Sequence, residues 1–487
     1  MTNRRDFLKL SAVAISALTL PKELFADTTN FSDYKALVVI YNGGGNDGFN
    51  TFIPSGDDPL TGYSNYIKAR ENIGVKNIDL ALPITDNQLN LSGGNPYADG
   101  NDLVNSYTKG FYRHANMDLA TNALMPEVAH LVNQGKVAVV TNVGNLIAPA
   151  TKEEFKAKTK TLPPFLFAHN HQTKLAMNGE ASKLDYTGWA GRLFDNWIDL
   201  NGGDIYGMNI SIGRSEHLFY GDKTEGLTIR SGGPTSYSQI KREIYEELLA
   251  NEQSDKFKQL YQELQKHSFD MQDTLVNDWK NNAPTFTSKN AYGGKLFSEP
   301  SKEQLQQSNL IKADTEVLKQ LHAVAKLAYI GKNRGLKRQI FFIYDGGYDT
   351  HNNQSAQHAR KLRGLSLAIG DFQKALAEMG MEDEVTTFNI SDFGRSIGDN
   401  GDGTDHAWGS NLFVVGGAVK GGLYGTLPDL TLGSKDDLSR KGRLIPTTSM
   451  SQYYGTIVKW FGVDEAMLQK VVSELSNFDV KDLGFMG

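Results

Sequence analysis

Three apolar runs of this 487-residue chain each end in acidic residues. Carboxylates, together with imidazoles, are side chains that hold divalent cations in proteins. The acids therefore indicate metal chemistry, provided that the three segments meet in space. The runs and the acids that follow them are residues 35–41 with Asp47, residues 339–344 with Asp345 and Asp349, and residues 385–390 with Asp392.

The composition of these runs predicts how they are placed. Each is continuous and rich in β-branched and aromatic residues, which is typical of a strand buried on both faces. Parallel strands point the same way, so the acids would gather at the edge outside the carboxyl ends, where open α/β sheets bind ligands. We therefore expect distant Asp and His residues to meet at one divalent metal site. For any single run, the alternative is a buried strand followed by an ordinary Asp/Gly turn.

Four residues are candidate metal ligands from their own surroundings. Asp349 and His351 lie two positions apart in a loop past the second run, where two glycines permit a tight backbone path. The alternative for this pair is a polar turn. Asp392 comes directly at the end of the third run, and His406 lies in the glycine-rich loop 401–409, ahead of a further apolar run.

Two more residues are candidates for catalysis. Arg395 follows Asp392 by three positions and could bind an oxyanion with two donors, helped by backbone N–H groups of glycine-rich segments. Its alternative role is a salt bridge to Asp392 or a neighbour. His169 and His171 form a polar cluster, and because residues two apart do not share a helix face, we expect only one of them in the site and take His169 as the candidate.

Charge and composition exclude several classes of protein. The formal net charge of −6 argues against a nucleic-acid surface. The chain has no cysteine, which excludes disulfides, a thiolate nucleophile and cysteine-ligated metals. The glycines at 43–48 lack the spacing of a dinucleotide fingerprint, so no nucleotide or flavin cofactor is expected.

The N-terminus resembles an export signal. Residues 1–26 combine Arg4 and Arg5 with a modest apolar stretch and end in Ala26, the pattern of a signal peptide cleaved near that alanine. The arginine pair looks like the bacterial twin-arginine signal, so its export machinery is an expected partner and the periplasm the expected location. A short amphipathic helix is the alternative. This apolar stretch is too short to span a bilayer, and no later segment has about 20 uninterrupted apolar residues, so we expect no permanent membrane span.

The rest of the chain shows the rhythm of an α/β protein. Further strands are expected near residues 136–143 and 411–416, and helices near 354–379 and 449–461. A mostly helical pattern at about 238–330 predicts an insertion beside the sheet.

Motifs spread over nearly the whole chain resemble those of one family, the twin-arginine-exported bacterial proteins catalogued as domain of unknown function 1501. That family is similar to the alkaline phosphatase and sulfatase superfamily. The motifs are Arg4–Arg5, residues 42–48, 167–170, 347–351, 392–396, 405–409 and 414–422, and the ending 453–462.

The resemblance implies a three-layer fold at residues 27–487, with a mainly parallel central sheet between helices and metals at the carboxyl ends of the strands. By position, Asp47 looks like the metal ligand after the first strand. Two departures are Phe393, where phosphatases of the superfamily keep a histidine, and Ala168, where related members often have serine. No nucleophile is assigned; Thr141 and Ser182 are substitutes without positional support.

We therefore expect a metal-dependent hydrolase of phosphate or sulfate esters, with a small anionic substrate. The expected metal ligands are Asp47, Asp349, His351, Asp392 and His406, and Asp and His donors suit zinc, manganese or calcium. The alternative is a catalytically degenerate member of the same fold that binds a metal, an anion or a protein partner.

Overall fold

The structure is a computed structural model. It describes residues 31–80, 107–201, 203–236, 239–249, 256–299 and 314–487. The predicted signal peptide at residues 1–26 lies outside these ranges.

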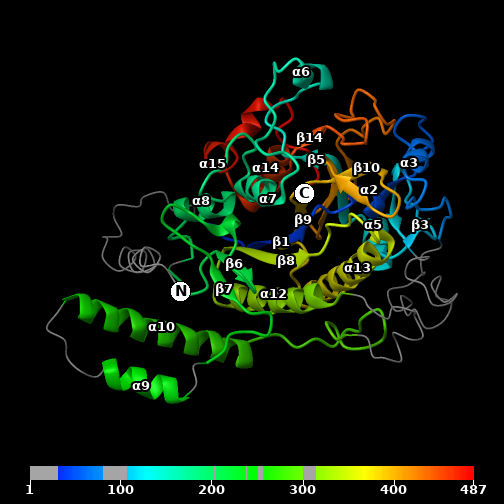
Figure 1. Ribbon diagram of the computed structural model, residues 1–487. Coiled ribbons are helices and arrows are strands. Elements are labelled where there is room, and N and C mark those ends of the chain that lie inside the picture. Colours follow the sequence, from blue (N-terminus) through cyan, green and yellow to red (C-terminus); the bar gives the residue numbers. More distant parts are fainter. Residues whose placement is uncertain (1–30, 81–106, 202, 237–238, 250–255, 300–313) are drawn as a thin grey trace.

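A nine-stranded sheet forms the centre of the molecule (Figure 1). Its strand order is β13-β5-β12-β9-β1-β8-β6-β7, and β14 pairs with β5. The strands are β1 (Lys35–Gly43), β5 (Val137–Gly144), β6 (Asn209–Ile212), β7 (Leu227–Ile229), β8 (Arg338–Gly346), β9 (Val385–Ser391), β12 (Ser410–Val415), β13 (Gly422–Tyr424) and β14 (Thr448–Ser449).

The three runs that end in acids are neighbouring parallel strands, as predicted. β1 lies in the middle and pairs in parallel with β8 on one side and β9 on the other. Their carboxyl ends therefore meet at the same edge. The sheet is mixed, because β12 runs antiparallel to both β5 and β9. The predicted α/β fold with a mainly parallel sheet is confirmed.

Helices cover both faces of the sheet and give three layers (Figure 1). Alternate residues of β1 enter different cores, since successive side chains of a strand point to opposite faces. Val38 and Ile40 pack with the first helical layer, and Leu37 and Val39 with the second. The first layer is α5 (Pro126–Asn133), α12 (Glu316–Asn333) and α13 (Gln354–Glu378); the second is α7 (His169–Asn178), α8 (Trp189–Asn196), α14 (Met450–Phe461) and α15 (Glu465–Val471).

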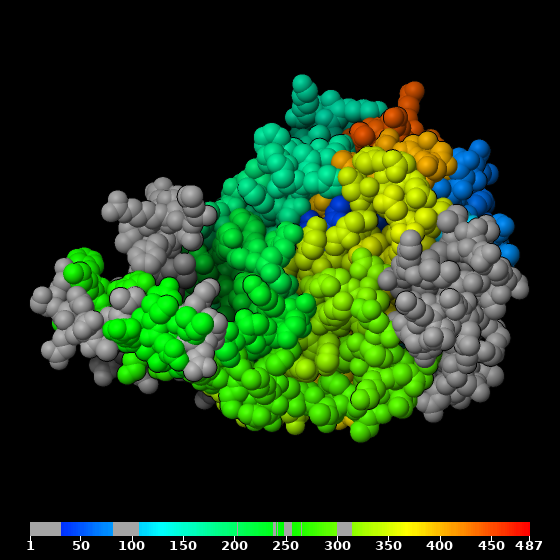
Figure 2. Space-filling model, turned by 60° about the horizontal axis from the view of Figure 1, so that its bottom comes forward, coloured from blue at the N-terminus to red at the C-terminus, as the bar shows by residue number. Residues whose placement is uncertain are grey.

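The region predicted as a helical insertion, at about 238–330, contains helices of two kinds. α9 (Gln239–Leu249) and α10 (Lys256–Asn281) extend away from the layers, and the same green arm projects in the space-filling view (Figure 2). In contrast, α12 packs its buried face on the sheet, where Leu327 and Phe341 share one core.

Smaller elements surround the carboxyl edge of the sheet. A two-stranded hairpin joins β10 (Arg395–Asp399) to β11 (Thr404–His406) and sets Arg395 opposite His406. The others are α2 (Gly48–Thr51), α3 (Tyr63–Ala69), α6 (Lys152–Lys156), the 3-10 turns His217–Phe219 and Ser473–Asn477, and a sheet of β2 (Phe52–Pro54), β4 (Leu119–Asn122) and β3 (Phe111–Tyr112). Among the described helices, none combines the length and apolar character needed to cross a bilayer.

Candidate metal centre

Four side chains from three segments converge at the carboxyl edge of the sheet. The loop after β8 supplies Asp349 and His351, the first residue of α7 is His169, and the last residue of β11 is His406. We call these four residues the His–Asp cluster. Figure 2 shows a hollow between teal, yellow and orange parts of the chain, with blue atoms at its bottom. These colours correspond to the parts of the sequence that contain α7, the loop after β8, the β10–β11 hairpin and, in blue, the region of β1.

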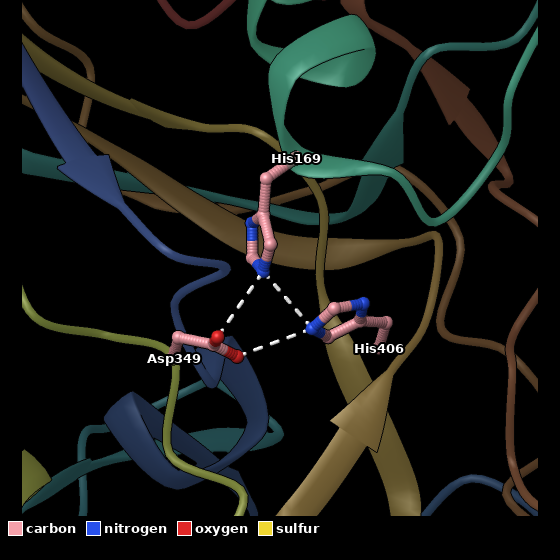
Figure 3. A group of neighbouring side chains, drawn as sticks. All are labelled: His169, Asp349 and His406. Carbon is pink, nitrogen blue, oxygen red and sulfur yellow. Dashed lines mark hydrogen bonds and ion pairs between the residues drawn. The ribbon is translucent and has the colours of Figure 1, made fainter.

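The donor atoms of the cluster lie close together. The Nε2 atom of His406 is 2.9 Å from Nε2 of His169 and 2.9 Å from Nε2 of His351. The Asp349 carboxylate lies 3.1 Å from His406, 3.2 Å from His351 and 3.3 Å from His169. Figure 3 shows the side chains of His169, Asp349 and His406 pointing toward one another. The arrangement thus aims three imidazole nitrogens and a carboxylate at one region.

Hydrogen bonds on the far side of two rings determine which nitrogen carries the proton. His169 Nδ1 lies 2.5 Å from the Asp392 carboxylate, and His406 Nδ1 lies 2.9 Å from the carbonyl oxygen of Phe167. A carbonyl or an ionised carboxylate only accepts, so both Nδ1 atoms donate. In the neutral rings both Nε2 atoms then carry lone pairs, and these face each other and Asp349. A proton or a cation between them is needed to make this contact favourable.

The surroundings of the cluster shift the pKa values of its groups in opposite directions. The hydrogen bond to Asp392 raises the pKa of His169. Burial lowers the pKa of His406 and outweighs its hydrogen bonds to Phe167 and Asp349. For Asp349, burial would raise the pKa, but hydrogen bonds to Arg395 and His406 lower it below its usual value. The carboxylate is therefore favoured in its ionised form, as a cation ligand requires.

Asp392, predicted as a ligand, instead lies behind His169. Its Oδ1 atom accepts from the backbone N–H groups of Gly44 at 3.0 Å and Gly45 at 2.7 Å. The backbone needs glycine at residue 44, because φ is +114° and a Cβ there would lie 2.5 Å from the nitrogen of Asp349. Both N–H groups are thus bound to Asp392, which also orients the ring of His169, as carboxylates behind histidines commonly do at metal sites.

Arg395 is also placed differently from a substrate-binding group. Its side chain is fully buried, and Nη1 donates to Asp349 at 2.8 Å. Nε and Nη2 donate to the hydroxyl and carbonyl oxygens of Thr404. The alternative prediction for Arg395, a salt bridge to Asp392 or a neighbour, describes this geometry. The partner is Asp349.

Asp47 does not join the cluster. Its Oδ2 atom lies 2.5 Å from Arg70 Nη1 and 2.5 Å from the Gln354 amide, and its Oδ1 accepts from the backbone of Asn50 at the start of α2. Arg70 comes from the segment after α3, whose position the sequence did not reveal. The structure therefore gives Asp47 a buried arginine as its counter-ion.

The two departures from the superfamily pattern also have a place in the site. The ring of Phe393 packs against His169 and His406, with centroids 4.6 and 4.7 Å away. Ala168 is the residue before α7 and contributes no side-chain cap. Thr141, one suggested nucleophile, is buried in β5 and donates to Asn411, while the backbone of Ser182 bonds to Glu474. Neither is a member of the cluster.

Sequence reasoning placed His169 in the site but did not identify it as a candidate ligand. The signal was present in the short motif 167–170, which resembles family sequences. The sequence did not predict that the carbonyl of Phe167 accepts from His406. Every residue has a backbone carbonyl, so the residue type does not indicate this role.

The donor set fits a divalent transition metal. Zinc bonds to nitrogen and oxygen are about 2.0–2.1 Å long, so neighbouring donors of a tetrahedral site lie about 3.3 Å apart. The observed separations of 2.9–3.3 Å are close to this. Calcium takes six to eight oxygen ligands, which three imidazoles do not supply. The cluster would hold zinc or manganese through His169, Asp349 and His406, with His351 beside them.

Fold and site together define an α/β protein with a candidate metal centre at the carboxyl edge of its sheet. Residues 34–470 match the sequence model of the family described as "Protein of unknown function (DUF1501)", and the chain belongs to this family. No curated protein sequence matches the chain.

Two solved structures show a distant likeness. One is Ps i-CgsB in complex with k-i-k-neocarrahexaose, at 10% identity and a TM-score of 0.31, covering 90% of this chain and 74% of that one. The other is the PsFucS1 sulfatase from Pseudoalteromonas sp., at 14% identity and a TM-score of 0.24, covering 90% and 73%. Neither likeness supports an argument about what this chain binds.

Proposed function

We propose that this protein is a metal-dependent hydrolase of phosphate or sulfate esters. One observation carries the proposal: the Nε2 atoms of His169 and His406 lie 2.9 Å apart beside a carboxylate. This contact is stable when a cation lies among the three groups. The resemblance to the alkaline phosphatase and sulfatase superfamily supports the choice of substrate.

The cluster is open to solvent on one side. The exposed fraction of the side chain is 45% for Asp349 and 44% for His351. A polar ester is therefore able to reach the donor atoms without passing through the core. The opening lies outside the strand ends, where α/β sheets bind their ligands.

The residues around the opening hold the side chains that would bind a metal for hydrolysis. A bound divalent cation supplies Lewis-acid chemistry, drawing electron density from an ester oxygen and lowering the pKa of water. Asp392 and the Phe167 carbonyl accept from Nδ1 of two rings, so that Nε2 of each neutral ring is free of protons. Arg395 fixes the position of Asp349 by donating a hydrogen bond from Nη1 to its carboxylate. Hydrolysis then adds water across the ester. The water oxygen bonds to the phosphorus or sulfur, the bond from that atom to the ester oxygen breaks, and a proton of the water goes to the leaving oxygen, which departs as an alcohol.

Zinc and manganese are the proposed metals. Imidazole suits both, and carboxylate oxygen suits manganese as well. The expected calcium is disfavoured because its site would need more oxygen donors than the cluster offers.

The alternative function is binding without turnover. It is favoured by the position of Arg395, which was expected to hold an oxyanion but pairs with Asp349. The nearby N–H groups of Gly44 and Gly45 are likewise bonded to Asp392. Under this alternative the centre binds its metal, and the anion or partner protein is held without being cleaved.

Metal titration followed by an ester assay tests both functions. The purified protein is stripped with a chelator, and zinc, manganese and calcium are added while thermal unfolding is followed. Panels of aryl phosphates and sulfates are then assayed. We expect stabilisation by zinc or manganese and turnover of at least one ester class. Metal binding with no turnover would favour the alternative.

A matched pair of variants makes the titration specific. His406→Ala removes a cluster histidine, whereas His267→Ala removes an exposed histidine on α10, outside the cluster. We expect only the first to lose metal binding. If no metal stabilises the wild-type protein, the proposed centre is refuted.

We further propose that the protein is exported to the periplasm by the twin-arginine machinery. The basis is the sequence of residues 1–26, with its Arg4–Arg5 pair. Changing both residues to lysine keeps the charge and is expected to leave the protein in the cytoplasm. Unchanged periplasmic yield in cell fractionation would argue for another route.

A further inference from the structure

The segment ahead of α7 holds two aromatic residues in an unusual backbone conformation. φ is +52° at Phe165 and +74° at Phe167. Residues other than glycine rarely adopt this left-handed region, since Cβ crowds the backbone there. Such conformations persist where the surrounding structure enforces them, and they concentrate at functional sites.

The conformation at Phe167 directs its carbonyl oxygen at the metal centre. That oxygen accepts the hydrogen bond from His406 Nδ1 at 2.9 Å. If φ of Phe167 took a negative value, the adjoining peptide groups would turn and His406 would lose this acceptor. The ring would then be free to carry its proton on Nε2, which faces the cluster, and a protonated nitrogen cannot bind a metal.

Arg443 connects the other two members of this contact. Its guanidinium lies over the Phe167 ring, 4.5 Å from the centroid, and its Nε donates to the backbone oxygen of His406 at 3.0 Å. His406 is thus held at its ring by Phe167 and at its backbone by Arg443, while Arg443 and Phe167 hold each other. The three residues close a triangle beside the metal centre.

We propose that Phe167 and Arg443 are positioning residues of the metal centre, which keep His406 in the form that carries its proton on Nδ1. This inference rests on the proposed metal centre. Neither side chain is a member of the cluster, and both act through His406. The inference adds two residues from outside the ligand set to the determinants of metal affinity.

The first test compares Arg443→Ala with Arg440→Ala. Arg440 is an exposed arginine in the same loop and serves as the matched control. Zinc affinity is measured by competition with a chelator. Loss of an outer-shell partner typically weakens binding about 10–100-fold, and we expect a loss in this range for Arg443→Ala and none for Arg440→Ala. Equal affinity in both variants would overturn the inference.

A second measurement needs no metal. In metal-free protein, the ¹⁵N shifts of the His406 ring report which nitrogen carries the proton. We expect a proton on Nδ1 alone in the wild type and a mixture of tautomers in Arg443→Ala. An unchanged tautomer in a folded variant would contradict the proposed role, whatever happens to zinc.

Substitutions at Phe167 separate the backbone from the ring. Glycine accepts a φ of +74° readily, whereas β-branched isoleucine strongly disfavours it. Both lose the aromatic ring that Arg443 covers. We therefore expect Phe167→Ile to bind zinc more weakly than Phe167→Gly, and Phe165→Ala to bind like the wild type. Tighter binding by the isoleucine variant would overturn the inference.

The outcomes distinguish this inference from the proposed function. If wild-type protein binds no zinc or manganese, the metal centre itself is refuted. If wild-type protein binds zinc while all Phe167 and Arg443 variants bind it equally well, only the positioning role fails.

Discussion

Asp349 and Asp47 follow neighbouring strands of one sheet, yet they have opposite surroundings. Asp349 is half-exposed and faces three imidazoles as well as the guanidinium of Arg395. Asp47 is fully buried and faces the guanidinium of Arg70. Both acids have an arginine partner, so their exposure and their remaining neighbours separate them. Asp47 is enclosed with its counter-ion and is structural, whereas Asp349 keeps an open side among imidazoles, where a metal is able to reach it.

The largest expected effect separates the two acids by stability. Arg70→Ala leaves the Asp47 carboxylate buried without its partner, which typically costs about 3–5 kcal/mol. We expect urea unfolding to show a loss in this range, with little change for the exposed Lys68→Ala control on α3. A small loss for Arg70→Ala would show that the buried pair is not what holds this region.

The next effect concerns the metal. Asp349→Asn removes the charge of the cluster while keeping its shape, and we expect zinc affinity to fall by more than about 100-fold, beyond the usual loss for an outer-shell partner. Wild-type protein with zinc at 100 times its dissociation constant should gain about 2.7 kcal/mol of stability. Equal zinc stabilisation of the variant would break the distinction between Asp349 and Asp47.

Asp392→Asn is expected to act on the metal more weakly. An amide has one acceptor atom and one donor group, so it cannot accept from both His169 and the N–H groups of Gly44 and Gly45. The His169 ring loses its fixed orientation, and zinc affinity should fall about 10–100-fold. Isothermal titration measures this. A loss as large as that of Asp349→Asn would make Asp392 a ligand rather than an orienting residue.

The smallest expected effect is the pH dependence of the stability that ionised Asp47 contributes. Burial would raise the pKa of Asp47, but the charge and hydrogen bonds of Arg70 lower it below its unfolded value. A lowered pKa gives stability that is present above the unfolded pKa, about 3.9, and lost as the pH falls through the folded pKa. The stability difference between wild type and Asp47→Asn should therefore shrink when urea unfolding is repeated below about pH 4. A difference independent of pH would contradict this.

Much of the fold could be predicted from local patterns. Runs such as residues 35–41 and 385–390 are rich in β-branched and aromatic residues on both alternating faces, which is typical of a strand with both faces covered. The shared edge for Asp349, His351 and His406 follows once those strands are parallel. The predicted joint role of Asp47 and Asp392 as ligands depended on partners that the pattern does not contain.

Those partners come from distant segments. Arg70 lies beyond α3, and it reaches Asp47 only through the packing of α3 near β10. His169 and Asp392 are 223 residues apart in the sequence. They are neighbours because α7 begins next to the carboxyl end of β9. No residue type near Asp47 or Asp392 records either approach.

The sequence by itself determined the strands and the acids at their ends, because the continuity of apolar residues along a run is a local property. The tertiary structure decided which acid is enclosed with its arginine, which acid also meets histidines and which imidazole nitrogen faces the cluster. These outcomes depend on hydrogen-bond partners brought together by packing, including a backbone carbonyl that any residue type carries.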